Sequence, residues 1–179
     1  SLAIDNAGKM HISYTHVLGD LKYASNELGS WQEGTLENTG AIATNTSIAV
    51  DSDNDIHIAY YDILEYRLRY ASIVSGFLWI ETIDAGWVGE YCSIAVDSNN
   101  KIHISYYDLT LSNLKYATNA SGSWEVFTID NTGMVGKYSS IAIDANNKAH
   151  VCYYDQTNED LKYATNASGS WTTITVDNT

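Results

Sequence analysis

The sequence predicts an all-β fold, a β-propeller-like domain of four blades with four antiparallel strands in each. The first observation behind this prediction is a unit that recurs four times, with its starts 46, 46 and 47 residues apart. The second is that every unit divides into four short strand-like segments, which is typical of propeller blades. We therefore expect a single repeat domain over 1–179, with blades at 1–46, 47–92, 93–139 and 140–179.

The same landmarks recur in the same order within every unit. Each unit opens with Ser-Leu/Ile-Ala-Ile/Val-Asp, continues with a His and a Tyr, and ends with Leu-x-Tyr-Ala and a Trp. The landmark positions are His11, His57, His103 and His150; Tyr14, Tyr60, Tyr106 and Tyr153; Leu21, Leu68, Leu114 and Leu161; and Trp31, Trp79, Trp124 and Trp171. Matches in register over nearly the whole chain indicate one structural unit repeated four times.

The third unit shows how the residues form each strand. Its first strand, 93–97, places Ile and Val on one face and Ala on the other, and an Asn-rich turn follows. The second and third strands, 102–107 and 114–118, are rich in the Ile and Tyr that favour pleated, half-buried surfaces. A Ser- and Gly-containing turn at 119–123 leads into the fourth strand, and no stretch of the chain has a sustained helical period.

Radial packing of these units is favoured over a flat solenoid. The first strand carries a small residue at one place in every unit, as crowding near an axis requires, at Ala3, Ala49, Ala95 and Ala142. The longest connection joins the fourth strand of one unit to the first strand of the next, as an outermost-to-innermost crossing needs. A parallel β-helix is the alternative, but its coils are usually shorter. A closed four-bladed ring and a sector of a larger ring both remain open.

The composition limits the partners. The chain is 45% apolar and 17% charged, which is typical of a globular domain, and its formal charge of −13 excludes a nucleic-acid partner. No apolar run is long enough for membrane insertion. Cys92 is expected in a connection and Cys152 in a strand, so a symmetric metal site is not expected, and a disulfide between them remains open.

The repeat string resembles that of a known group of proteins. Ser-Ile-Ala-Val-Asp followed by His-Ile-Ser-Tyr-Tyr-Asp and Leu-Lys-Tyr-Ala is similar to a tandem repeat of exported and cell-surface proteins of archaea and bacteria. That resemblance implies a propeller-like architecture and no particular activity. The stretch from Thr118 to Trp124 more weakly resembles the Asp-box of sialidase-like propellers, without its Asp. It also resembles fucose-binding propeller lectins, whose sugar-holding Arg and Glu have no repeated counterpart here.

Most recurring polar residues have a structural explanation. The four strand His are equivalent and therefore spread around an axis, so we expect satisfied interior side chains rather than a metal site or an acid–base pair. Asp62, Asp108 and Asp155 are expected to pair across strands with the base of the third strand, such as Arg69. No catalytic motif is found, and the chain is expected not to be an enzyme. No cofactor is expected, although Asp51, Asp53 and Asp55 resemble the start of a calcium loop.

The departures from the repeat supply the candidate sites. Trp87 and Tyr91 lie in the connection between the second and third units, and Tyr138 matches Tyr91 in the next connection. Exposed aromatic rings stack on sugars or on partner side chains, so these three are the candidate ligand-binding residues. Three Asn-x-Ser/Thr sequons predict glycosylation in an exported protein, at Asn45, Asn119 and Asn166.

The sequence therefore favours an extracellular, non-catalytic interaction or scaffolding module of a secreted or cell-surface repeat protein. A nearly uniform repeat without gathered catalytic groups is the observation behind this interpretation. The expected partners are other protein chains or copies of itself, and glycans. The first alternative is a lectin-like, carbohydrate-binding propeller, and the second is a fragment of a sialidase-like glycoside hydrolase.

Overall fold

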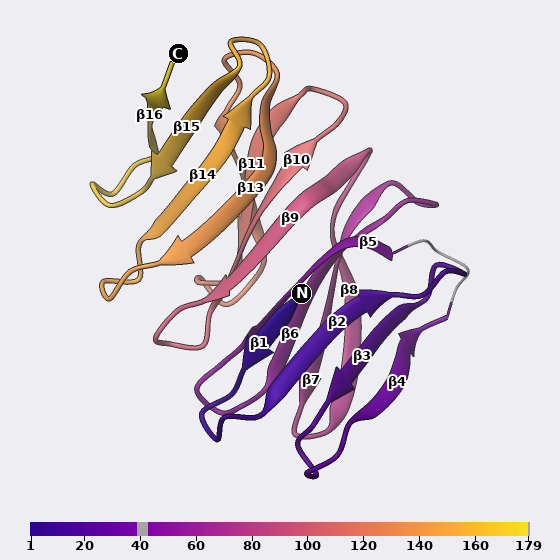
Figure 1. The fold of residues 1–179 in the computed structure, drawn as a ribbon. Helices are drawn as coiled ribbons and strands as arrows, with labels where there is room; N and C mark the ends of the chain where they lie inside the picture. The colour runs from indigo at the N-terminus through magenta and orange to yellow at the C-terminus, as the bar shows by residue number, and fades with distance from the viewer. Residues whose placement is uncertain (39–42, 179) are drawn as a thin grey trace.

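The computed structural model describes residues 1–38 and 43–178. The fold is all-β and propeller-like, with four sheets of four antiparallel strands that follow one another in chain order. Figure 1 shows the sheets arranged along an open arc, with the first sheet at one end and the last at the other. Of the two arrangements left open by the sequence, the chain thus adopts the open sector. Within the described ranges there is no helix with the length and hydropathy needed to cross a membrane.

Each sheet is one blade, numbered 1 to 4 along the chain. Blade 1 contains β1 (Leu2–Ile4), β2 (Met10–Thr15), β3 (Leu21–Ser25) and β4 (Gln32–Glu37). Blade 2 contains β5 (Ala43–Val50), β6 (Ile56–Asp62), β7 (Arg67–Val74) and β8 (Phe77–Ala85). Blade 3 contains β9 (Val88–Val96), β10 (Ile102–Asp108), β11 (Asn113–Thr118) and β12 (Glu125–Asp130). Blade 4 contains β13 (Val135–Ile143), β14 (Ala149–Asp155), β15 (Asp160–Thr165) and β16 (Thr172–Asp177).

The blades pack face to face, and each gap between neighbours holds one apolar cluster. We call the face that carries Tyr60 and its equivalents the front face, and the face that carries Leu68 and its equivalents the back face. In the gap between blades 2 and 3, Leu68 and Tyr70 of one back face pack against Ile94, Ile104 and other residues of the next front face. The other two gaps repeat this arrangement. The core is therefore three inter-blade layers rather than one central cluster.

The inner strands β5, β9 and β13 begin upstream of the serine that opens each repeat, and each contains a bulge. Asn45, Tyr91 and Tyr138 adopt positive φ angles of 51°, 52° and 55° at this place. The expectation that Cys92 lies in a connection is wrong, because the extended strand β9 includes it and buries it. Cys152 is exposed in β14, and both thiols are free, so the two do not form a disulfide.

One predicted landmark is out of register. The β7–β8 hairpin closes with a two-residue turn in which Ser75 and Gly76 have φ angles of 50° and 81°, typical of a type I′ turn. The other described hairpins between third and fourth strands have longer loops. Trp79 consequently pairs with Ser72, whereas Glu125 holds the matching place opposite Thr118. Trp79 is therefore not structurally equivalent to Trp124 and Trp171, although its spacing in the sequence suggested so.

The expected cross-strand ion pairs are present in blades 2 and 4, with Arg69 3.8 Å from Asp62 and Lys162 4.0 Å from Asp155, but each of these bases has a shorter contact with an acid of the preceding blade. Asp130, at the end of β12, accepts hydrogen bonds from Lys162 at 2.5 Å and Tyr153 at 2.6 Å, both in blade 4. The predicted partner of Lys162, Asp155, lies farther away at 4.0 Å and instead caps the following turn through its Oδ1. Glu37 and Asp84 hold the place of Asp130 in blades 1 and 2 and bind the blade that follows. In blades 1 to 3, an acid at the end of the fourth strand therefore clamps the next blade.

Candidate functional site

Every blade contains an Asp–His–Tyr cluster between its first three strands. The His Nδ1 lies 2.5–2.6 Å from the Tyr hydroxyl, and the His Nε2 lies 3.2–3.4 Å from an Asp Oδ2. The other oxygen of that Asp accepts two backbone N–H groups of the turn that follows β1 or its equivalent. The four clusters are Asp5–His11–Tyr23, Asp51–His57–Tyr70, Asp97–His103–Tyr116 and Asp144–His150–Tyr163.

These clusters join the turn to the sheet. Burial lowers the pKa of His57 and His103, which keeps both rings neutral near neutrality. In blade 2 the Nε2–H then donates to Asp51 and Nδ1 accepts from the Tyr70 hydroxyl. Burial also raises the pKa of the Tyr116 phenol to about 12. The prediction of satisfied interior His is confirmed for His57, whereas His11 and His103 are buried with Nε2 3.4 Å from the Asp and without a hydrogen bond at that atom, and His150 is only partly buried.

The cavity between blades 3 and 4 has a volume of about 300 Å³ and combines an aromatic wall with polar groups. Blade 3 contributes Tyr116, Glu125 and Phe127, and blade 4 contributes Trp171 and two amides. The Trp171 ring meets the edge of Tyr116 at 5.0 Å between centroids, and Tyr116 lies 6.2 Å from Phe127. The amides belong to Asn147 and Asn166. The wall offers a ring-sized apolar surface rimmed by hydrogen-bonding groups.

The neighbouring gap, between blades 2 and 3, has a tryptophan with a hydrogen-bond partner at the same place. The Trp124 indole N–H donates to Glu81 at 3.0 Å, and its ring packs edge-on against Tyr70. In the next gap, Phe127 occupies the register position of Glu81, opposite the third-strand Tyr. The Trp171 indole N–H therefore has no acceptor among the residues that the structure describes. It is a donor available to a ligand.

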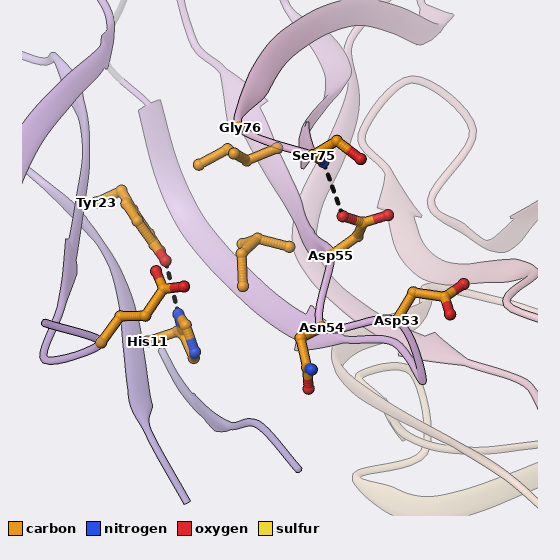
Figure 2. A pocket seen from close by; sticks show the side chains of 10 residues that line it. His11, Tyr23, Asp53, Asn54, Asp55, Ser75 and Gly76 are labelled. Carbon is orange, nitrogen blue, oxygen red and sulfur yellow. Dashed lines mark hydrogen bonds between the residues drawn. The ribbon is translucent and has the colours of Figure 1, made fainter. Parts of the chain in front are cut away.

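The cavity between blades 1 and 2 is larger, about 440 Å³, and mostly polar (Figure 2). Because the β7–β8 turn is short, no tryptophan covers it, and Ser75 and Gly76 form one rim. Figure 2 shows His11 and Tyr23 of blade 1 on one side of this space and Asn54 and Asp55 of blade 2 on the other, while the Asp53 carboxylate points away from the blade 1 residues. Asp55 accepts the Ser75 N–H at 3.0 Å. Among the described lining residues, the rings are those of Tyr23 and His11.

The predicted ligand-binding residues fall into two separate groups. Trp87 stacks flat on Tyr66, with 4.0 Å between ring centroids and an interplanar angle of 1°. Tyr91 and Tyr138 lie 4.5 Å apart on neighbouring inner strands. The three are thus not gathered in one cavity that the structure defines. The aromatic wall at Trp171 and Phe127 was not singled out by the sequence, because its members come from different repeats.

The predicted calcium residues have other partners in the structure. Asp51 binds its own turn and His57, Asp53 accepts from the Asn100 amide at 2.8 Å, and Asp55 accepts from Ser75. Among the described residues, no group of three or more His, Cys, Asp or Glu is arranged to hold a metal ion. Calcium binding at Asp51, Asp53 and Asp55 stays a prediction that only a titration with the ion can test.

The sequon asparagines differ in their surroundings. Asn45 is exposed on the bulge of β5. Asn119 and Asn166 are half-buried, and their Oδ1 atoms accept the Ile102 and Ala149 N–H groups at 2.8 Å. Asn166 also lines the cavity between blades 3 and 4, so a glycan on its amide nitrogen would compete with a ligand there. Glycosylation at these three positions remains a prediction.

No protein-family model matches the chain, and no curated protein sequence matches it either. Solved structures with the same fold include a fungal lectin from Aleuria aurantia, described as a six-bladed β-propeller with a novel fucose recognition mode. It aligns with a TM-score of 0.68 at 16% identity and covers 98% of this chain and 61% of that one. SapL1 lectin, in complex with α-methyl fucoside, aligns with a TM-score of 0.68 at 15% identity over 99% of this chain and 63% of that one.

A sialidase aligns less closely. NanB sialidase from Streptococcus pneumoniae has a TM-score of 0.60 at 16% identity, and the match covers 88% of this chain and 28% of that one. The chain spans less than two thirds of the lectin chains that it matches. At these identities the likeness concerns the fold. The arrangement of four sheets and the structural neighbours agree that this chain has a β-propeller-like architecture.

Proposed function

We propose that this chain is a carbohydrate-binding propeller module that holds a sugar between blades 3 and 4. The single observation that carries the proposal is the wall formed by Trp171 and Phe127, with an indole N–H that has no acceptor within the described part of the chain. Sugar rings present apolar C–H faces that pack on aromatic rings and hydroxyls that need donors and acceptors. The Asn147 and Asn166 amides and the Glu125 carboxylate supply such groups at the rim.

The same residues favour a neutral sugar. Recognition of a carboxylate-bearing sugar calls for arginine, and the only two arginines of the chain are in ion pairs with Glu37 and Asp62. The charged residue in the cavity is an acid, Glu125. Its carboxylate accepts hydrogen bonds from hydroxyl groups and repels the carboxylate of a sugar acid. Two of the structural neighbours are lectins described with fucose or a fucoside, so fucosides are the natural first probes.

The cavity supports binding of a sugar without its hydrolysis. Glycoside hydrolysis normally needs two carboxyl groups that flank the scissile bond. Within the described lining of this cavity, Glu125 is the one carboxyl group. The sialidase-like alternative would also need an arginine cluster, which the two paired arginines do not supply.

The decisive experiment is a glycan array followed by calorimetric titration of the best neutral glycan. We expect saturable binding that Trp171→Ala and Phe127→Ala each weaken about five- to thirtyfold, because an aromatic contact in such a site contributes on the order of 1–2 kcal/mol. Far-ultraviolet circular dichroism checks that each variant is folded. Unchanged affinity in both folded variants would contradict the proposal.

Trp87→Ala is the matched control, because this exposed tryptophan stacks on Tyr66 outside the cavity. We expect the Trp87→Ala variant to bind like the parent chain. Loss of binding in Trp87→Ala alone would instead place the ligand at the connection that the sequence singled out. A blank array at millimolar glycan would leave the scaffolding interpretation as the better one.

The interaction role predicted from the sequence, outside the cell and with protein partners, is compatible with this proposal. The extracellular setting and the protein partners stay predictions from the sequence.

A further inference from the structure

One hydrogen-bond acceptor of the gap between blades 2 and 3 is missing from the cavity between blades 3 and 4. Glu81 of blade 2 accepts the Trp124 indole N–H at 3.0 Å. Phe127 has the place of Glu81 in blade 3, so the Trp171 N–H has no acceptor among the described residues. An indole N–H is a donor only, and a ligand with an acceptor atom can satisfy it.

A second acceptor is missing from the same cavity. Asp53 of blade 2 accepts an amide N–H of Asn100 at 2.8 Å across the gap between blades 2 and 3. At the equivalent places of the next gap, the described residues Asn99 and Asn147 form no hydrogen bond with each other. The Asn147 Oδ1 accepts from the N–H and the hydroxyl of Ser98 at 3.1 and 2.8 Å. The part of the Asn147 amide left for a ligand is therefore its NH₂ group.

Asn166 is in the same state as Asn147. Its Oδ1 accepts the Ala149 N–H at 2.8 Å, so its NH₂ group is the part left for a ligand. The cavity is also lined by His103, Tyr116 and Thr118. These three side chains are hydrogen-bonded to one another through the His103 Nδ1, which lies 3.2 Å from the Thr118 hydroxyl. They are therefore not the groups that a ligand has to satisfy.

The free side-chain groups of this cavity are mostly donors. The described lining has three N–H donor groups without an acceptor in the described chain, on Trp171, Asn147 and Asn166. The carboxylate among the described lining residues is Glu125. A sugar hydroxyl that accepts one of these N–H groups brings a proton of its own, which needs an acceptor. A carbonyl oxygen has two lone pairs and no proton, so it matches several donors better.

We propose that the ligand of this cavity is an N-acetylated hexosamine, an inference that rests on the sugar binding proposed above and names the class of sugar. The acetamido carbonyl oxygen accepts hydrogen bonds from the Trp171 indole and the asparagine amides. The acetamido N–H donates to the Glu125 carboxylate, and the acetamido methyl group packs on the Phe127 ring. A plain hexose has a hydroxyl in place of this group and leaves part of the donor set unmatched.

Calorimetric titration of the parent chain with methyl glycosides tests the class of sugar. The probes are the methyl glycosides of N-acetylglucosamine and N-acetylgalactosamine, and those of glucose and galactose as the matching hexoses. We expect one or both N-acetylated probes to bind at least about tenfold more tightly than the matching hexose, because buried donors left without a partner weaken binding. The methyl glycoside of glucosamine is the further probe, because attraction of its ammonium to Glu125 alone would make it the tightest ligand.

Two variants test whether the free donors recognise the acetamido group. Trp171→Phe keeps an aromatic ring and removes the indole N–H. Asn99→Asp gives Asn147 the kind of acceptor that Asp53 gives Asn100, at an exposed turn position outside the cavity lining. Each variant should lower the ratio of the N-acetylated to the hexose affinity at least about threefold, because each removes one free donor.

Asn146→Asp is the matched control, because it adds the same charge at the equivalent turn position of blade 4, outside the cavity lining. It should leave the ratio of affinities unchanged. Equal affinities for the N-acetylated and hexose probes would overturn this inference and leave the proposed sugar binding in place. So would tightest binding of the glucosamine probe, or a ratio that neither Trp171→Phe nor Asn99→Asp lowers. Failure of every neutral glycan to bind would overturn both.

Discussion

The clamp between blades 3 and 4 gives the sharpest test of how the arc is held together. Asp130 is buried and accepts hydrogen bonds from Lys162, Tyr153 and Thr132 at 2.5–2.6 Å. Lys162 is itself 7% exposed. Replacing Asp130 with Asn removes the negative charge and keeps the shape of the side chain. The buried Lys162 ammonium then has Asp155, 4.0 Å away, as its other carboxylate partner.

The expected loss of unfolding free energy is about 3–5 kcal/mol, the usual cost of removing one partner from a buried ion pair. Most of it comes from the uncompensated Lys162 rather than from the lost attraction. We therefore expect Asp130→Asn/Lys162→Met to be less destabilised than the sum of its two single variants, because the double variant buries neither charge. Urea unfolding followed by tryptophan fluorescence, at one fixed protein concentration, measures all three values.

Glu33→Gln is the control for this series, because it breaks the same kind of contact with Lys22 and Tyr14 on an exposed face. Its effect on stability should be much smaller, since exposed ion pairs are weakened by solvent. If Asp130→Asn costs no more than Glu33→Gln, the clamp does not stabilise the packing of the blades.

The same residue predicts a pH dependence. Burial alone would raise the pKa of Asp130, but the hydrogen bonds from Lys162, Thr132 and Tyr153 outweigh it and hold the pKa at about 2, below the ordinary 3.8. A carboxyl with a depressed folded-state pKa stabilises the fold above its unfolded pKa and loses that contribution as the pH falls through the folded pKa. The difference in unfolding free energy between the parent and Asp130→Asn should shrink as the pH falls from about 4 to about 2. Because solvent screens the charge, we expect this change to be less than about 2 kcal/mol.

Two further predictions concern the inner strands and the thiols. Gly136→Ala should be more destabilising than Gly122→Ala by about 1–3 kcal/mol, measured by urea unfolding, because both have positive φ but only at Gly136 would a Cβ lie 2.7 Å from the Leu114 Cα. Equal losses would show that the close approach is not limiting. In a thiol-reagent assay on the dilute native chain, Cys152 should react and Cys92 should not, since Cys92 is buried and burial raises its pKa to about 12. Reaction of both thiols without denaturant would contradict this burial.

The fold could be predicted because each repeat specifies its own strands and turns. Turn residues such as Asp97 and Asn99 and the alternating apolar residues of β10 are local signals, and the structure follows them. The register of Trp79 could not be predicted by aligning landmarks, because the turn at Ser75 and Gly76 is shorter than its counterparts. The pairing of Lys162 with Asp130 rather than Asp155 depends on how sheets stack, which one repeat does not encode by itself.

The candidate site was harder to predict for the same reason. Phe127 and Trp171 are far apart in the sequence and meet only because the back face of one blade covers the front face of the next. The sequence did contain one signal for this site. Phe127 has the position that Glu81 has in blade 2, so the tryptophan of the next blade loses its hydrogen-bond acceptor. Recognising it requires knowing that Trp124 and Glu81 touch. The aromatics chosen from the sequence, Trp87 and Tyr91, were chosen because they break the repeat, and each has an aromatic neighbour in the structure.

The contacts between blades run in one direction along the chain. Each clamp joins an acid at the end of a fourth strand to a cation and a phenol on the front face of the next blade, as Asp130 binds Lys162 and Tyr153. Asp84 binds Lys115 and Tyr106 in the same way one blade earlier. Trp171→Ala leaves Asp130, Lys162 and Tyr153 in place, so a loss of sugar binding in that variant can be told apart from a loss of the clamp between blades 3 and 4.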